Sequence, residues 1–331
     1  MNILFYGTKK YDEVFFNSLL PRFPNIHIHF LEANIGTDTA MLAKGYDAVC
    51  VFVNAELPAA VLRQLYECKI RLILLRCAGY NNVDLKAART YEMTLLRVPG
   101  YSPEAVAEHA MALALTANRH THKAYIKCRE NNFALNGLMG INFYGKTAGI
   151  IGTGKIGVAM AKICKGFGME VIAYDPYPLK NAEDFSYVSL EELLQNSDLI
   201  SLHCPLTKET HHIIREQTIS QMKNDVVLVN TSRGGLIKTD DLIAGIRSHK
   251  FFAVGLDVYE EETAFVYEDL SEEILPRSTI ARLLSFPNVT MTSHQGFFTR
   301  EALHNIAQTT LENANSFEKG ELLTDRIVPL S

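Results

Sequence analysis

The sequence predicts an α/β protein of two domains: a doubly wound Rossmann domain and a second, flavodoxin-like domain. A length of 331 residues suits about two domains. Short apolar runs alternate with amphipathic helical segments along the chain, as parallel sheets with helical crossovers require. A G-x-G-x-x-G pattern at residues 152–157 stands between an apolar run and a helical segment, which is the context of a dinucleotide-binding turn.

Three glycines and one acid predict the cofactor. Gly152 allows a tight strand-to-helix turn, Gly154 leaves room for a pyrophosphate, and Gly157 lets helix and strand pack closely. The unbonded N–H groups at the helix start favour phosphate charge. Asp175 ends the next apolar run, where its carboxylate would bind the adenosine ribose hydroxyls and repel a 2′-phosphate. We therefore expect NAD rather than NADP, although a glycine turn in an ordinary βαβ unit has the same spacing.

Six strands are predicted in the second half of the chain, in the alternation of a doubly wound parallel sheet. They cover residues 148–151, 170–174, 199–203, 226–229, 253–256 and 289–291. A capping box begins a helix at Ser189, and another helix starts at Asp240. The last helix covers residues 299–319, and Gly320 closes it.

The first hundred residues predict a smaller open sheet. Its strands cover residues 3–6, 26–31, 48–53 and 72–75. Pro58 opens a helix to residue 68, and Asp84 caps another that runs to Tyr91.

A breaker cluster at residues 99–103 marks the boundary between the domains. The helix that follows has Ser102 as its cap and Pro103 at its first position. Its residues 105–117 are apolar nearly all round, so we expect burial between domains or against another subunit.

Composition argues against several classes of partner. With 32 basic and 37 acidic residues the net charge is −5, which disfavours nucleic acid and anionic membranes. No apolar run approaches a membrane span, and the N-terminus is typical of a strand rather than a signal peptide. The six cysteines form no C-x-x-C pair and suit a reducing, cytoplasmic compartment. We expect no metal site, because the pairs His211–His212 and His120/His122 lack the spacing and acidic partners of one.

Three polar residues follow strands in the second half: Arg233, Glu262 and His294. The carboxyl ends of parallel strands meet at one crevice, so these residues can converge. A nicotinamide enzyme that acts on a 2-oxo acid needs such a set. Arginine binds the substrate carboxylate, histidine protonates the carbonyl oxygen, and an acid holds the histidine and favours its charged form. Each residue taken singly is more often structural.

At these positions the sequence resembles the D-2-hydroxyacid dehydrogenase family, and within it the fermentative D-lactate dehydrogenases. The resemblance covers nearly the whole chain. The matching stretches are residues 75–84, 104–110, 144–157, 201–207, 230–234, 255–260 and 293–295. Gly296 departs from the pattern, since related sequences carry alanine there, and this affects the shape of the pocket beside His294.

The resemblance implies roles for individual residues. Arg233 would bind and polarise the substrate, and His294 would donate the proton with Glu262 as its partner. Asp257 would contact the nicotinamide amide. The backbone of Cys77, Ala78 and Gly79, with the Tyr101 side chain, would hold the substrate carboxylate, and Phe297 would close over the methyl group of pyruvate. The residues lining the NAD site would be Gly152, Gly154, Lys155, Ile156, Gly157, Asp175, Cys204, Pro205, Thr210, Thr231, Ser232, Arg233 and Asp257.

The resemblance also implies an organisation and leaves alternatives open. Residues 1–100 and 299–331 would form the substrate domain and residues 101–298 the NAD-binding domain, in a homo-oligomer that is a dimer or a tetramer. The implied reaction is reversible, NAD-dependent reduction of pyruvate to D-lactate. A reductase of broader 2-oxo acid specificity is one alternative. An NAD-sensing binding protein, like the co-repressors that share the fold and the three polar residues, is another.

Overall fold

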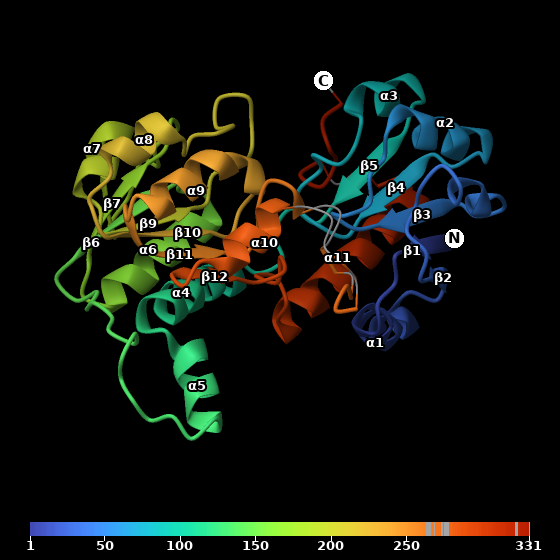
Figure 1. The fold of residues 1–331 in the computed structure, drawn as a ribbon. Helices are drawn as coiled ribbons and strands as arrows, with labels where there is room; N and C mark the ends of the chain where they lie inside the picture. The colour runs from blue at the N-terminus through green and yellow to red at the C-terminus, as the bar shows by residue number, and fades with distance from the viewer. Residues whose placement is uncertain (263–265, 268, 273, 275–277, 322–323, 331) are drawn as a thin grey trace. The chain divides into compact units, whose positions relative to one another are not determined.

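The computed structural model describes residues 1–262, 266–267, 269–272, 274, 278–321 and 324–330. Contacts within the chain define two compact units (Figure 1): Met1–Ser102 with Phe297–Ser331, and Pro103–Gly296. The second unit is thus inserted into the first along the chain. Each junction lies two residues from a predicted domain boundary.

The first unit is built on a five-stranded parallel sheet of order β2-β1-β3-β4-β5. This is the flavodoxin-like order, so the predicted class is confirmed. Its strands are β1 (Asn2–Tyr6), β2 (His27–Leu31), β3 (Ala48–Val51), β4 (Leu72–Leu75) and β5 (Thr94–Arg97). Its helices are α1 (Lys10–Leu19), α2 (Ala59–Glu67), α3 (Leu85–Thr90) and α11 (Arg300–Glu318), with 3₁₀ turns η1 (Leu20–Arg22) and η2 (Ala40–Ala43).

Helices from both ends of the chain cover one face of this sheet. Phe16 of α1 and Leu311 of α11 share a buried cluster with Phe5 and Leu72 of the strands, while α2 and α3 lie on the other face (Figure 1). Thr299 caps α11 by accepting a hydrogen bond from the Ala302 amide, so the helix begins where it was predicted.

The second unit is built on a seven-stranded parallel sheet of order β12-β11-β10-β9-β6-β7-β8. Its strands are β6 (Thr147–Ile151), β7 (Glu170–Tyr174), β8 (Ser186–Tyr187), β9 (Leu199–Leu202), β10 (Val226–Asn230), β11 (Phe251–Leu256) and β12 (Val289–Met291). The helices are α4 (Pro103–Arg119), α5 (Thr121–Arg129), α6 (Lys155–Gly166), α7 (Leu190–Asn196), α8 (Glu216–Gln221), α9 (Thr239–Arg247) and α10 (Ser278–Ser285), with the 3₁₀ turn η3 (Gly234–Leu236). Six strands were predicted, and the two-residue edge strand β8 was missed.

The strand order reverses between β6 and β9, with β7 on one side of β6 and β10 on the far side of β9. Ligands of doubly wound sheets bind outside the carboxyl ends of the strands at such a switch point. The doubly wound prediction is confirmed. The loops after β6, β9, β10, β11 and β12 leave the carboxyl ends of their strands, where a ligand would bind.

Helix α4 packs partly within its own unit, a contact that the prediction did not name. Its residues Ala107, Ala110 and Ala114 are buried in a cluster that includes Met160 of α6 and Val229 of β10. Packing inside the second unit therefore covers one broad face of this helix, and burial against another domain or subunit stays a prediction. Among the described residues, no helix has both the length and the apolar character needed to cross a membrane.

Candidate active site

The glycine-rich turn after β6 has the geometry that its sequence predicts. Gly152 has a left-handed φ of 93°, and a Cβ there would lie 2.5 Å from the Cys204 amide nitrogen. A Cβ on Gly157 would lie 1.9 Å from the carbonyl oxygen of Gly152. Both positions therefore exclude a side chain through close packing. A Cβ on Gly154 would meet no atom within 4 Å, so this glycine opens onto free space at the start of α6.

A pocket of about 690 Å³ borders this turn within the second unit. Thr153, Gly154 and Lys155 line one side of it, and Glu104 and Glu108 of α4 line another. Its volume is in the range of small-molecule sites. Lys155 and Ile156 begin α6, and the Ile156 side chain packs against the core, which leaves its backbone amide as the group that can reach a phosphate.

Asp175 holds the turn in place. Its Oδ2 accepts hydrogen bonds from the Thr153 amide at 2.7 Å and the Thr153 hydroxyl at 3.0 Å, and its Oδ1 accepts from the Tyr177 amide at 2.9 Å. An ionised carboxylate has about four acceptor positions, so Asp175 can still accept from ribose hydroxyls. It thus has a structural task that the sequence did not reveal.

The loops after β9 and β10 are tied together beside the turn. Ser232 donates from its hydroxyl to the Cys204 carbonyl at 2.7 Å, and Thr210 donates to the Pro205 carbonyl at 2.6 Å. Burial raises the pKa of the Cys204 thiol to about 12, so this side chain is neutral. The hydroxyl of Thr231 is buried and has no hydrogen-bond partner in the described part of the chain. A buried hydroxyl without a partner fits a bound cofactor that would supply one.

Arg233 follows β10 and is half-buried. Its Nη1 donates to the Ser232 carbonyl at 2.7 Å, and its own carbonyl accepts from the Asn230 side chain at 2.9 Å. Among the residues that the structure describes, no carboxylate lies within ion-pair distance of this guanidinium. A fixed, half-buried guanidinium of this kind can bind a carboxylate or carbonyl oxygen of a ligand.

Glu262 and His294 meet as predicted. Glu262 Oε1 lies 3.1 Å from His294 Nδ1, and the two side chains are 15% and 16% exposed. This contact leaves Nε2 as the ring nitrogen that can face a substrate. Since β10, β11 and β12 are neighbouring parallel strands, Arg233, Glu262 and His294 follow the same edge of the sheet.

Asp257 directly follows β11 and is 2% exposed. Its carboxylate accepts hydrogen bonds from the Thr292 hydroxyl and from the amides of Gln295 and Gly296, and it lies 3.2 Å from His109 Nε2. Burial alone would raise the pKa of Asp257, but hydrogen bonds from His109 and Thr292 hold it below the ordinary value. Asp257 is thus an ionised, buried anchor, and its predicted contact with nicotinamide stays a prediction.

In the first unit, the loop after β4 presents backbone donors. None of the described residues accepts a hydrogen bond from the amides of Ala78 or Gly79. The Cys77 thiol donates to the Gly79 carbonyl at 3.3 Å, and Arg97 donates to the Ala78 carbonyl at 3.0 Å. Two amides that donate to none of the described residues, beside a guanidinium, are suited to a carboxylate. Arg97 was not predicted, because the strand that ends with it, β5, was missed.

An aromatic group lies nearby in the same unit. The ring of Phe297 is 5.3 Å from that of Phe52 and 6.4 Å from that of Tyr101. Asn305 of α11 donates to the Tyr101 carbonyl at 2.7 Å. Phe297 is 6% exposed, so it offers an apolar surface fixed by its neighbours.

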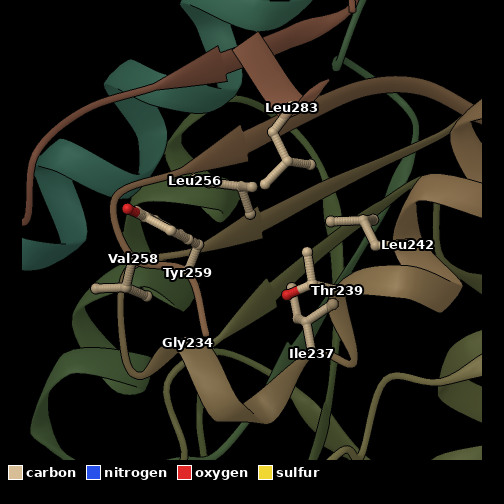
Figure 2. A pocket seen from close by; sticks show the side chains of 8 residues that line it. All are labelled: Gly234, Ile237, Thr239, Leu242, Leu256, Val258, Tyr259 and Leu283. Carbon is tan, nitrogen blue, oxygen red and sulfur yellow. The ribbon is translucent and has the colours of Figure 1, made fainter. Parts of the chain in front are cut away.

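A small cavity lies behind η3, and Figure 2 shows its lining. Gly234, Thr239, Leu256 and Tyr259 contribute to its walls, and its volume is about 10 Å³. This is room for about one water molecule, so the cavity does not hold a substrate. A Cβ on Gly234 would lie 2.1 Å from the Tyr259 carbonyl, which explains the glycine after Arg233.

The histidine pair after β9 has an acidic partner, contrary to the prediction. Glu260 Oε1 is 2.5 Å from His212 Nε2, and a ligand atom of His211 lies within 4.8 Å of both groups. Glu260 Oε2 also accepts hydrogen bonds from the Thr239 amide and hydroxyl. Both carboxylate oxygens of Glu260 therefore already bind groups of the protein, so the cluster serves to hold two loops together. Strand spacing in the fold, which the sequence did not show, brings Glu260 to this pair.

With this geometry established, comparison with known proteins decides the family. A sequence profile described as "D-isomer specific 2-hydroxyacid dehydrogenase, NAD binding domain" matches residues 111–296, more than half of the chain. The chain belongs to the D-2-hydroxyacid dehydrogenase family. As a D-2-hydroxyacid dehydrogenase it is an NAD-dependent oxidoreductase, and the predicted family, cofactor and enzyme class are confirmed.

Relatives of this dehydrogenase match it over its full length. The D-lactate dehydrogenase of Escherichia coli strain K12 is 46% identical over 330 residues, which cover 99% of this chain and 100% of that protein. The apo structure of D-lactate dehydrogenase from Escherichia coli matches with a TM-score of 0.89 at 45% identity, covering 99% of this chain and 100% of that one. A structure of the pyruvate reductase of Chlamydomonas reinhardtii matches with a TM-score of 0.91 at 40% identity, covering 98% of each chain.

Proposed function

We propose that this dehydrogenase catalyses the reversible reduction of pyruvate to D-lactate with NADH. The observation that carries the proposal is the His294–Glu262 pair, 3.1 Å apart, at the sheet edge that Arg233 also follows. Reduction of a 2-oxo acid requires a proton donor with an acidic partner and a guanidinium that is available to a carboxylate; Arg233 has no carboxylate partner among the residues that the structure describes. The names of the relatives, D-lactate dehydrogenase and pyruvate reductase, support pyruvate as the substrate.

Arg233 is proposed to bind the substrate carboxylate and polarise the carbonyl group. Its guanidinium is always charged and presents several donors in a plane, so it can engage two oxygens at once. The Asn230 side chain and η3 fix its backbone. The charge would be in place before substrate arrives, which is the condition for stabilising a developing alkoxide.

His294 is proposed to donate its Nε2 proton to the carbonyl oxygen as that oxygen gains negative charge. Bound NADH supplies the hydride to the substrate carbon. Glu262 would hold Nδ1–H, fix the ring and favour the charged imidazolium. In lactate oxidation the neutral ring would take the proton back, by microscopic reversibility.

The first unit is proposed to contribute substrate contacts. The backbone of Cys77, Ala78 and Gly79 would bind the carboxylate through its N–H groups, with help from the Tyr101 side chain. Phe297 would cover the methyl group of pyruvate. The free amides of Ala78 and Gly79 support the first role, and the buried Phe297 ring supports the second.

The NAD site is proposed to follow the loops at the switch point. Gly152, Gly154 and Gly157, with the amides of Lys155 and Ile156, would hold the pyrophosphate at the start of α6. Asp175 would bind the adenosine ribose. The remaining contacts are assigned to Cys204, Pro205, Thr210, Thr231, Ser232, Arg233 and Asp257. The unpartnered Thr231 hydroxyl and the open space at Gly154 support this assignment.

We propose that the enzyme is a cytoplasmic homo-oligomer, a dimer or a tetramer, that serves fermentation. All six cysteines are free, which suits a reducing compartment. Helix α5 and the loop that follows it extend from the second unit (Figure 1). The loop exposes large apolar side chains, since Phe133 is 74% exposed and Leu135 is 80% exposed. Exposed apolar groups of this size mark interaction surfaces. Light scattering should give a multiple of the chain mass, and Phe133→Asp with Leu135→Asp should reduce it.

The test of the main proposal is NADH oxidation with pyruvate, in the parent and in Arg233→Lys. An ammonium keeps the positive charge but does not reproduce a bidentate pair, so the variant should raise KM for pyruvate and lower kcat by much more than it raises the NADH Kd. Unchanged kinetic constants in Arg233→Lys would show that Arg233 does not bind the substrate.

The same assay separates the alternatives. A panel of pyruvate, phenylpyruvate, 2-oxoisocaproate and glyoxylate measures specificity directly. Similar kcat/KM for all four would identify a broad 2-oxo acid reductase. NADH binding without turnover on any of them would identify an NAD-sensing binding protein and reject the proposed function.

A further inference from the structure

One buried carboxylate holds the loop that carries His294. Asp257 Oδ1 accepts from the Gln295 amide at 2.9 Å, and Oδ2 accepts from the Gly296 amide at 2.8 Å. The main-chain carbonyl of Asp257 also accepts from the amide of His294 at 2.8 Å. Three consecutive amides of the loop are therefore bound by a single residue at the end of β11.

The backbone of His294 needs this support. Its φ is 49°, in the left-handed region that residues other than glycine seldom adopt. Such a conformation persists only where the surrounding structure fixes it, and it is concentrated at functional sites. The Tyr267 hydroxyl donates to the His294 carbonyl at 2.9 Å, which fixes the peptide from the other side. The direction of the His294 ring therefore depends on contacts outside its own side chain.

His109 of α4 completes the network around Asp257. Its Nε2 lies 3.2 Å from Asp257 Oδ1 and 3.0 Å from the hydroxyl oxygen of Thr292. The Thr292 hydroxyl is itself 2.6 Å from Asp257 Oδ1, and an ionised carboxylate can only accept. Thr292 therefore donates to Asp257, and its oxygen is free to accept from His109. This pattern assigns the proton to Nε2 of His109.

The network leaves little free space. The His109 side chain is 17% exposed and that of Asp257 is 1% exposed. A Cβ on Gly296 would lie 3.1 Å from Asp257 Oδ2 and 3.5 Å from His109 Cδ2. The first distance is tighter than ordinary packing and the second is an ordinary van der Waals contact. A displacement of His109 would therefore be transmitted to Asp257 and to the loop that carries His294.

We propose that His109 is a positioning residue for the proton donor, acting through Asp257 and Thr292 on the left-handed backbone of His294. This role rests on the proposed function, because His294 is the proton donor that His109 would position. It donates one hydrogen bond from Nε2 into the carboxylate and hydroxyl that hold residues 292–296. With that bond in place, the His294 ring meets Glu262 and points Nε2 outward. Without it, the loop that carries His294 is no longer held in one position, and the His294 ring is misaligned for proton donation.

The first test compares two substitutions of His109. His109→Leu fills similar space without a donor, whereas His109→Gln places an amide N–H near the position of Nε2. His109→Leu should lower kcat for pyruvate reduction by about 10- to 100-fold, since a misplacement of about 1 Å costs that much. KM for pyruvate and the NADH Kd should change by less than about threefold. His109→Gln should recover most of the lost kcat.

Thr292→Val is a second variant that tests the same network. It removes the hydroxyl with little change of shape and should lower kcat in the same direction. The double variant His109→Leu/Thr292→Val should lose much less than the product of the two single losses, because both act through Asp257. If His109→Leu does not fold, His109→Gln and Thr292→Val still test the network, because NADH binding reports on their integrity.

A second readout does not depend on turnover. Histidine side-chain ¹H–¹⁵N spectra, with His294 assigned by His294→Ala, report the His294–Glu262 hydrogen bond directly. The His294 signals should move in His109→Leu and return in His109→Gln. If the parent reduces no 2-oxo acid but the signals respond in this way, the proposed function fails and the positioning role stands.

Three results would overturn the proposal. One is a kcat of His109→Leu within about twofold of the parent. Another is a loss of NADH affinity that parallels the loss of kcat, which would place His109 in cofactor binding or general stability. The third is failure of His109→Gln to restore either kcat or the His294 signals, which would show that the donor is not the functional group.

Discussion

Replacing Gly154 by alanine should weaken NADH binding and leave the fold intact. A Cβ at this position meets no protein atom within 4 Å, and the backbone angles of φ −64° and ψ −175° suit any residue. The added methyl group would therefore enter only the space that we assign to the pyrophosphate. A hydrogen bond to a charged group contributes about 1.5–3 kcal/mol. Loss of one such bond should raise the NADH Kd about 10- to 150-fold.

The Gly154→Ala variant should be slightly more stable toward unfolding than the parent. Alanine at a position with compatible backbone angles stabilises by about 0.4–1 kcal/mol, because it restricts the unfolded chain. Fluorescence titration gives the NADH Kd, and urea unfolding without cofactor gives the free energy of unfolding. A higher NADH Kd together with an equal or higher free energy of unfolding would separate a ligand effect from damage to the fold.

Two glycines of the same helix and turn serve as controls. Gly166 ends α6 and also has no atom within 4 Å of a built Cβ. It lies about 18 Å along the helix from the turn, so Gly166→Ala should leave the NADH Kd within twofold. Gly157→Ala forces a Cβ to 1.9 Å from the Gly152 carbonyl and should destabilise the fold by about 1–3 kcal/mol or more. An unchanged NADH Kd in Gly154→Ala would refute the assignment of this turn to the pyrophosphate.

Three further predictions address specificity, proton transfer and pH. Asp175→Ala should narrow the preference for NADH over NADPH in kcat/KM, because the charge that repels the 2′-phosphate is lost; equal use of both cofactors by the parent would contradict the role of Asp175. Glu262→Gln removes the negative charge 3.1 Å from His294 and should move the alkaline limb of kcat/KM for pyruvate to lower pH; an unmoved limb would reject the pairing or show that another step sets the profile. Burial lowers the pKa of His203 to about 4, so its neutral form is favoured in the folded chain. The unfolded chain binds the proton near pH 6.5, so the stability from His203 is present above that pH and lost as pH falls toward 4, by about 3 kcal/mol. Urea unfolding from pH 4 to 8 should show this slope in the parent and a flatter one in His203→Gln; equal slopes would exclude His203 as its source.

The parts of the fold that sequence predicted well are those set by local requirements. Gly152 combines a left-handed φ with a Cβ position 2.5 Å from the Cys204 amide nitrogen, and a Cβ on Gly157 would meet a backbone oxygen, so glycine is the residue that fits at both. Asp84 caps α3 through its own side chain, so its signal lies within a few residues. The edge strand β8 has two residues and too little pattern to predict.

Contacts between distant residues could not be predicted in the same way. His109 is 148 residues from Asp257, and no spacing rule links them before the strands and α4 are placed. Asp12 and Arg76 form an ion pair at 3.5 Å inside the first unit, although both residue types are usually exposed. Glu262 and His294 were paired through family resemblance, because the chain between them carries no periodic signal.

The insertion of one unit into the other has a consequence for the order in which the chain can fold during synthesis. The core of the first unit needs Ala307 and Leu311 of α11, which pack with Phe5 and Leu72. Domains fold as units while the N-terminal part is made first. Residues 103–296 bring all seven strands of their own sheet and can fold as soon as they emerge. The first sheet, although made before residues 103–296, must wait with the part of its apolar face that α11 covers still exposed until α11 leaves the ribosome. Its core is therefore completed, and protected from aggregation, after that of the unit that follows it in the chain.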